Sequence, residues 1–418
     1  MQRWYRFLKA VTVLAILSLA LDARAQGPSY RLKELFVPQT SEFTQQHPGA
    51  VSSFDLSPDG KTLAVEFGTR EPDKTNGAWV ALWDVDRQRL IGTKQVDGDI
   101  PDLVWYMHEI RFSPDGRTLL VLTGPRLAAF SFPELKVLYN FEERVLPQNA
   151  QKQMIIEGFS MAADRLAILQ QYDHNSDHDR ELEVKIADLD TGKVLACWRK
   201  PGLSQSIALS PDASLLALTI NPGPWGVRNI LRGADNIFVL KAQSGSVVRA
   251  FSSGSAAGNA EFVSGNSTLT TMPINSDFEP EDAAMLWNLK TGQLEQKLGY
   301  PKYGVRGGMS ASSDGKLLAV AAIWLNRMDI KLDRDNPRGG ARLLLWSLPS
   351  GKLIYSSHEQ LSQEYDLGGL PISMLLGGAW GGSPPVLVRF SASGNRLAVG
   401  GGLISVSSLE TAPAGPAK

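Results

Sequence analysis

One phrase returns along the whole chain and limits its possible folds more than any other feature. It reads FDLSPDGKTLAV at 54–65 and IRFSPDGRTLLV at 110–121. Further copies are IALSPDASLLAL, MSASSDGKLLAV and VRFSASGNRLAV, and two weaker copies, FSMAADRLAILQ and AEFVSGNSTLTT, fill the gaps. Asp or Asn next to Gly supplies the positive φ that a tight hairpin needs. Each copy therefore predicts a strand, a tight turn and a second strand.

A second phrase follows each copy of the first. It reads VALWDVDRQRLIG, VKIADLDTGKVLA and LLLWSLPSGKLIY, with equivalent turns such as Thr191-Gly192 and Ser350-Gly351. One unit is thus two hairpins with a period of roughly 50 residues, which is typical of propeller blades. We count seven units, and they start near Val51, Ile110, Phe159, Ile207, Ala260, Met309 and Val386. The sequence predicts an all-β chain, a seven-bladed β-propeller of four-stranded antiparallel blades.

The last unit is short and supplies three strands, VRFSASGNRLAVGGGLISVSSLE. We expect its fourth strand to come from the N-terminal segment YRLKELFV at 30–37, which would close the ring and leave no exposed edge strand there. A solenoid, the other common repeat architecture, does not explain an incomplete last unit beside a spare N-terminal strand. The expected organisation is a propeller over 26–410, with a signal peptide before it at 1–25 and a disordered tail at 411–418.

The repeats resemble the WD-repeat β-propeller superfamily, in particular its degenerate bacterial exported branch. The resemblance covers residues 30 to 410. Trp-Asp occurs once, at Trp83-Asp84, whereas Trp287 and Trp346 are followed by other residues, and no Gly-His dipeptide occurs. The hydrogen-bond network of the strict family is therefore not expected. The three tryptophans occupy equivalent strand positions, and we interpret them as packing between blades rather than as a quinone-binding stack.

The N-terminus predicts export. Arg3, Arg6 and Lys9 precede an apolar run at 10–21, and Ala23-Arg24-Ala25 is typical of a signal-peptidase site before Gln26. The run is shorter than the ~20 residues of a membrane span. Cleavage would remove four basic residues and one acidic residue, so the formal net charge would fall from −1 to −4. An acidic exported chain is not expected to bind nucleic acid, and we predict a periplasmic or secreted monomer without a membrane span.

Candidate chemistry is sparse, and we expect no cofactor, metal site or catalytic residue. The single cysteine, Cys197, lies in the apolar segment KVLACWRK and is predicted to be a buried, inert thiol. The loop DHNSDHDRE, which starts at Asp173, resembles a calcium loop, but His178 replaces the expected Gly and no Glu follows at the twelfth position. It fits a solvated hairpin tip better. The acidic run NSDFEPED at 275–282 is interpreted as a solvated loop.

Loop length suggests where the protein binds. First-to-second and third-to-fourth connections of a blade share one face of a propeller and are short here, whereas the other connections are long and irregular. Long loops on a rigid scaffold tend to carry function. They hold bulky residues of the kinds that dominate binding hot spots. The predicted partner-binding residues are Trp105, Tyr106, His108, Trp225, Tyr303, Trp324, Arg327 and Trp380.

The sequence favours a non-enzymatic exported scaffold that binds a protein, peptide or polysaccharide of the envelope or extracellular space through its long-loop face. The alternative is a propeller enzyme, of lactonase or quinoprotein type, with its site at the mouth of the central channel. An enzyme should gather several His, Asp, Glu or Arg side chains from different blades at that mouth. The five histidines fall in distant segments, which favours binding.

Overall fold

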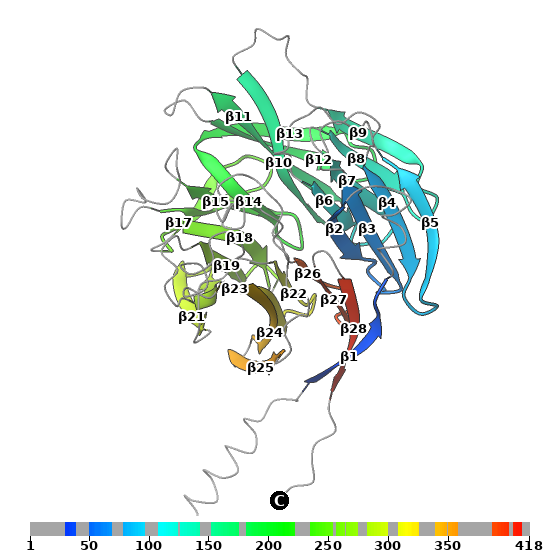
Figure 1. Cartoon of the computed structure of the whole chain (residues 1–418). Coiled ribbons are helices and arrows are strands. Elements are labelled where there is room, and N and C mark those ends of the chain that lie inside the picture. Colours follow the sequence, from blue (N-terminus) through cyan, green and yellow to red (C-terminus); the bar gives the residue numbers. More distant parts are fainter. Residues whose placement is uncertain are drawn as a thin grey trace, which may run out of the picture.

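Seven four-stranded antiparallel sheets are arranged around a central axis as the blades of a β-propeller (Figure 1). The predicted fold class is therefore confirmed. The structure is a computed structural model and describes residues 30–38, 50–68, 78–96, 108–123, 126–142, 152–174, 181–221, 235–253, 256–263, 265–274, 282–299, 308–325, 339–348, 350–357, 387–400 and 404–411. Within these ranges, no helix is long and apolar enough to cross a membrane. The predicted signal peptide at 1–25 lies outside them, as do all but the first residue of the predicted tail.

The blades follow one another along the chain, and each runs from an inner to an outer strand. Blade 1 consists of β2 (Ala50–Leu56), β3 (Thr62–Gly68), β4 (Trp79–Asp84) and β5 (Arg89–Gln95). Blade 2 consists of β6 (His108–Phe112), β7 (Thr118–Thr123), β8 (Arg126–Ser131) and β9 (Val137–Glu142). Blade 3 consists of β10 (Lys152–Ala162), β11 (Arg165–His174), β12 (Glu181–Asp188) and β13 (Val194–Pro201). Blade 4 consists of β14 (Leu203–Leu209), β15 (Leu215–Asn221), β16 (Ile237–Lys241) and β17 (Val247–Phe251). Blade 5 consists of β18 (Ala256–Phe262), β19 (Thr268–Ile274), β20 (Asp282–Asn288) and β21 (Gln293–Gly299). Blade 6 consists of β22 (Met309–Ala311), β23 (Leu317–Leu325), β24 (Gly339–Ser347) and β25 (Lys352–Ser356).

Blade 7 combines the two ends of the chain. It contains β26 (Leu387–Phe390), β27 (Arg396–Gly400), β28 (Ile404–Thr411) and, as its outermost strand, β1 (Tyr30–Phe36). β1 runs antiparallel to β28 from the pair Tyr30↔Thr411 to the pair Phe36↔Val406. The predicted closure by the N-terminal segment is thus confirmed. Because the first and last strands share one sheet, the ring is closed without a covalent link.

The repeated Ser-Pro-Asp-Gly turn owes its shape to its own side chains. In blade 1, Ser57 Oγ donates to Asp59 Oδ1 at 2.7 Å, and Asp59 Oδ1 accepts the backbone N–H of Lys61 at 3.0 Å. The backbone N–H of Thr62 in turn donates to Ser57 Oγ at 2.9 Å. Gly60 completes the turn with a φ of 73°, a value that favours glycine because it has no Cβ. These internal bonds explain why the phrase recurs.

The hydrophobic core is divided among the seven seams between adjacent blades. Each of the seven buried clusters joins residues of two neighbouring blades. Trp83, Trp287 and Trp346 are buried, each in a different seam. Trp287 packs against Phe251 of the preceding blade, with ring centroids 4.8 Å apart. The predicted role of these tryptophans between blades is therefore confirmed, and every blade depends on both neighbours for burial.

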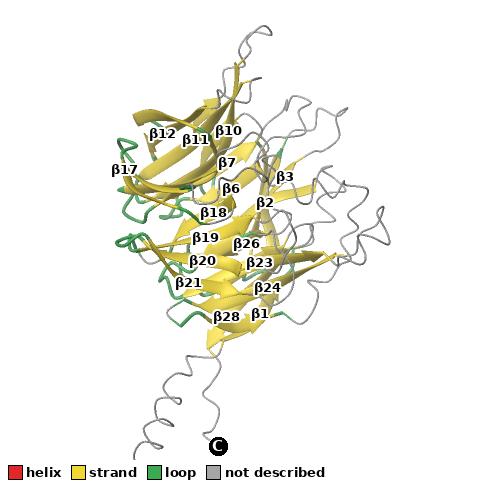
Figure 2. Ribbon diagram, turned by 90° about the vertical axis from the view of Figure 1, so that its left-hand side faces the viewer, coloured by secondary structure: helices red, strands yellow, loops and turns green. Residues whose placement is uncertain are grey.

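The two faces of the disc carry connections of very different length. On the short-turn face, the first-to-second and third-to-fourth strands are joined by tight turns such as 57–61, 85–88 and 113–117. Figure 2 shows described turns, drawn in green, gathered on the left. From the opposite face, which we call the long-connection face, the connections 96–107, 222–236, 326–338 and 357–386 arise. The long connections thus arise from one face, as predicted from the sequence, but this face also has short connections at 124–125 and 202.

Three expectations about blade 3 were wrong. Its first strand was expected to start near Phe159, and the connection between its second and third strands was expected to include Asp173 and His174. Instead, β10 begins at Lys152 and pairs with β11 as far as His174, because the hairpin continues through polar residues that we had interpreted as loop. Cys197 is exposed rather than buried, since β13 is the outermost strand of its sheet. Partial burial and the Glu183 carboxylate raise the pKa of its thiol.

Candidate functional site in the central channel

A cavity of about 490 Å³ occupies the centre of the ring. It is lined by residues of β2, β6, β10, β14, β18, β22 and β26, the innermost strands of all seven blades. Its lining extends from His108, at the long-connection end of β6, to Pro58 and Pro114 in the turns of the opposite face. The cavity therefore follows the channel through the depth of the disc.

The repeat places one side chain of every blade at the same level of this channel. The equivalence follows from strand register, because each of these residues pairs with the third residue of the TLAV-like strand of its own blade. The seven residues are Asp55, Arg111, Ser160, Ala208, Glu261, Ser310 and Arg389. At this position two blades have a carboxyl group and two have a guanidinium group, although the repeat itself does not require a charged residue there.

Several inner-strand side chains bind the backbone of the next blade. Asp55 Oδ2 accepts the N–H of Phe112 at 2.8 Å, and Glu261 Oε2 accepts the N–H of Ala311 at 3.1 Å. Hydroxyl groups make the same contact at four further places: Ser53 to Ile110, Ser160 to Leu209, Ser206 to Ala260 and Ser310 to Phe390. These bonds satisfy backbone donors at the inner strands, which would otherwise cost free energy when buried. They also join neighbouring blades around the channel.

Arginine holds the equivalent position in blades 2 and 7, and it cannot accept such a bond. Arg111 Nε instead lies 2.9 Å from Glu109 Oε1, and Arg389 Nη2 lies 3.7 Å from the same oxygen. Burial and the nearby Arg111 lower the pKa of Arg389 to about 10. For Arg111, the Glu109 and Asp55 carboxylates outweigh burial and raise the pKa. Both guanidinium groups are therefore charged at neutral pH, and they share one carboxylate oxygen.

Glu261 is a carboxyl group of the channel whose ionisation is altered by burial. Burial raises its pKa to about 7, against the opposing effects of the Ala311 N–H and of Arg111 and Arg389. Burial likewise raises the pKa of Asp55. Within the described part of the chain, neither Glu261 nor Asp55 is within ion-pair distance of a basic side chain. Glu261 therefore changes charge close to neutral pH.

His108 is the one predicted binding residue whose side chain the structure describes. It lies half-buried at the rim of the cavity, and its Nδ1 is 2.8 Å from Oε1 of the fully buried Glu66. Burial raises the pKa of Glu66. Trp324 lies near the long-connection end of β23, where its backbone pairs with Gly340, but its side chain is outside the described set. Trp105, Tyr106, Trp225, Tyr303, Arg327 and Trp380 lie outside the described residues.

The charged channel residues were not predicted, although the sequence contained a signal for them. In the repeated phrase, the residue after the first apolar position is Asp in FDLS, Arg in IRFS and VRFS, and Glu in AEFV. A charged residue inside a predicted inner strand needs a polar surrounding, which in a propeller is the channel. No described residues form a group of three or more His, Cys, Asp or Glu side chains that could hold a metal ion.

Comparison with known proteins supports the β-propeller fold alone. No protein-family model matches the chain, and no curated protein sequence does either. Among solved structures, it is similar to a chain of the mitotic checkpoint complex, with a TM-score of 0.53, 13% identity and 91% of each chain covered. It is also similar to the β-propeller domain of Myceliophteria thermophila Cps50 (Swd1), with a TM-score of 0.54 and 10% identity over 90% of this chain and 99% of that one. The chain has a β-propeller fold.

Proposed function

We propose that the protein is an exported, non-enzymatic scaffold of the bacterial envelope that binds a protein partner through its long-connection face. A propeller fold is compatible with such a role. The observation that carries the proposal is the one-sided distribution of connections, because 96–107, 326–338 and 357–386 all leave the same face of a rigid disc. His108 supports it, since it lies where that face meets the channel. Export is inferred from the N-terminal segment at 1–25.

The test uses Trp105, from the connection 96–107, and Trp324, near the long-connection end of β23. A Trp105→Ala, Trp324→Ala double variant should lose capture of the partner from envelope extract, with an affinity loss of roughly thirtyfold for about 2 kcal/mol at a hot spot. The matched control is Arg87→Ala with Lys193→Ala, both on the short-turn face. Its capture should equal that of the wild type. Loss of capture in the control, or retention in the tryptophan variant at unchanged thermal stability, would overturn the proposal. Capture of polysaccharide instead of protein would correct the partner class.

The charges in the channel favour an enzyme as the second candidate. Asp55, Glu109, Arg111, Glu261 and Arg389 come from four blades, as a channel-mouth active site would require. However, Asp55 and Glu261 each accept a backbone N–H of the next blade, and Glu109 contacts two arginines. These contacts give the carboxylates a structural role. Hydrolysis of a lactone or ester that is lost in Glu109→Gln, while the variant keeps its melting temperature, would establish the enzyme instead.

A further inference from the structure

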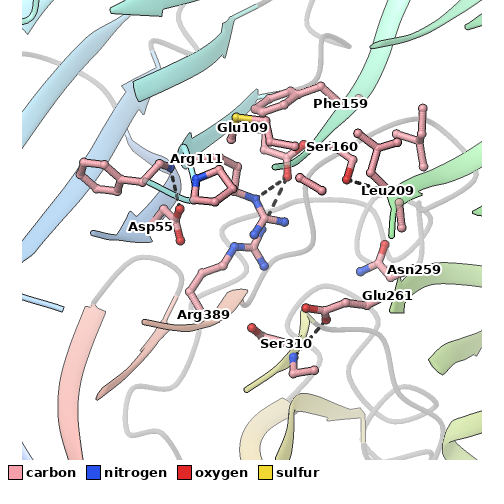
Figure 3. Close-up of a pocket in the computed structure, with 18 of the residues that line it drawn as sticks. Asp55, Glu109, Arg111, Phe159, Ser160, Leu209, Asn259, Glu261, Ser310 and Arg389 are labelled. Carbon is pink, nitrogen blue, oxygen red and sulfur yellow. Dashed lines mark hydrogen bonds and ion pairs between the residues drawn. The ribbon is translucent and has the colours of Figure 1, made fainter. Parts of the chain in front are cut away.

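The charged side chains are distributed unevenly around the central cavity. Arg111 and Arg389 come from blades 2 and 7, which are the two neighbours of blade 1 in the ring. Glu261 and Asn259 come from β18 in blade 5, on the other side of the ring from blade 1. Figure 3 shows the two guanidinium groups together and the Asn259 and Glu261 side chains pointing into the pocket from another side. The cavity therefore has a guanidinium wall and a separate wall with an amide and a carboxyl group.

Among the described residues, one carboxylate, that of Glu109, lies within ion-pair distance of the two guanidinium groups, and Asp55 acts on them from farther away. Glu109 Oε1 is the ion-pair partner of both arginines, at 2.9 Å and 3.7 Å. The side chain of Arg389 is 7% exposed, and its Nε has no hydrogen-bond acceptor in the described part of the protein. Leaving a buried donor without an acceptor is unfavourable. An acceptor that enters the cavity, such as a carboxylate, would satisfy this group.

The opposite wall lacks a cation. Glu261 uses Oε2 for the Ala311 N–H, and among described residues it has no basic side chain within ion-pair distance. The amide of Asn259 has no hydrogen-bond partner in the same set of residues. An ammonium group placed here would gain a carboxylate and an amide oxygen. Such charge-assisted bonds are stronger than neutral ones.

We propose that the central cavity binds a small zwitterion, either a free α-amino acid or a short peptide, with its carboxylate at Arg111 and Arg389 and its ammonium group at Glu261 and Asn259. The volume of about 490 Å³ is within the usual range for small-molecule sites. A plain anion would meet Asp55, Glu109 and Glu261, and a plain cation would meet the two arginines. Only a ligand with both charges matches both walls. The residues of the two walls lie on inner strands that line the channel, and the proposal does not rest on the function proposed above.

The experiment is calorimetric titration of the purified chain with L-alanine, L-alanyl-L-alanine, sodium acetate and methylammonium chloride. At least one of the first two should bind at a ratio of 1:1, and the two singly charged probes should bind at least tenfold more weakly. Stronger binding of L-alanine identifies a free amino acid as the ligand class, and stronger binding of the dipeptide identifies a peptide. Arg111→Lys, which loses the planar fork, and Glu261→Gln should each weaken zwitterion binding at least tenfold.

The matched controls are Arg199→Lys and Glu181→Gln on the outer strands of blade 3, which should bind as the wild type does. Each variant is first checked by thermal unfolding, and if Arg111→Lys does not fold, Glu261→Gln decides alone, because its amide oxygen can still accept the Ala311 N–H. The proposal is wrong if neither zwitterion binds, if acetate or methylammonium binds as tightly, or if the folded channel variants bind like the controls.

Discussion

At the scale of single residues, the first-hairpin turns depend on glycine for a conformational reason. Gly60 and Gly116 have φ values of 73° and 72°. A Cβ on Gly116 would lie 3.2 Å from Pro58 of the neighbouring blade. Gly92, in the exposed strand β5, has no atom within 4 Å of such a Cβ and no positive φ. A comparison of Gly116 with Gly92 thus separates the effect of the backbone conformation from the effect of replacing a glycine.

We predict that Gly116→Val destabilises the protein by about 1–2 kcal/mol or more, because β-branched residues are strained in the left-handed region. Gly92→Val should change stability by less than about 0.5 kcal/mol. Chemical denaturation of both variants measures the difference. Equal midpoints would show that the turn glycines are not required for their backbone conformation.

Glu261 should make stability depend on pH. Its pKa is about 7 in the folded protein and about 4.3 in an unfolded chain. Between these values the folded state binds more protons than the unfolded state. The contribution of Glu261 to the free energy of unfolding is therefore highest near pH 4 and falls as the pH rises to 7. The charged groups that face it are Arg111 and Arg389, and both stay protonated over this range.

Glu261→Gln removes this titration and keeps an acceptor for the Ala311 N–H. The free energy of unfolding of the variant minus that of the wild type should therefore be about 2–3 kcal/mol larger at pH 8 than at pH 5. Denaturant titrations at the two pH values measure the gain. A constant difference between the two proteins would mean that Glu261 is ionised at both.

At the scale of elements, β1 carries the closure of the ring. Phe36 is buried in the core between blades 7 and 1, and Leu32 packs in the core between blades 6 and 7. At the short-turn face, Arg396 of blade 7 reaches blade 1, where Nη2 lies 2.6 Å from Asp86 and Nη1 donates to the Gly60 carbonyl at 2.8 Å. β1 therefore contributes apolar area to two seams at once.

Phe36→Ala should reduce the free energy of unfolding by about 3–4 kcal/mol, as for other large-to-small substitutions of a buried Phe. Lys33→Ala, on the exposed side of the same strand, should have an effect within about 0.5 kcal/mol. Hydrogen exchange of the β28 amides gives a second measurement, and protection should fall in the Phe36 variant alone. Similar behaviour of the two variants would mean that closure depends on β28 and not on β1.

At the scale of the whole molecule, the fold could be predicted because the repeat determines it. Turn chemistry and strand alternation recur seven times, so errors at one blade are corrected by the others. The strand ends of blade 3 and the burial of Cys197 were predicted wrongly. Strand ends and the exposure of an outermost strand depend on strand pairing rather than on local composition. The charged channel could not be assembled from sequence alone, because Arg111 and Arg389 meet only when the ring closes.

The binding face is the central functional claim, and site-specific photocrosslinking tests it most directly. A crosslinking amino acid is placed at Gln95, Pro201 and Gly299, exposed at strand ends of the long-connection face, and at Asp86, Thr191 and Lys290 on the short-turn face. We predict adducts with one protein partner from the first set and none from the second. Adducts from the short-turn positions alone would contradict the account.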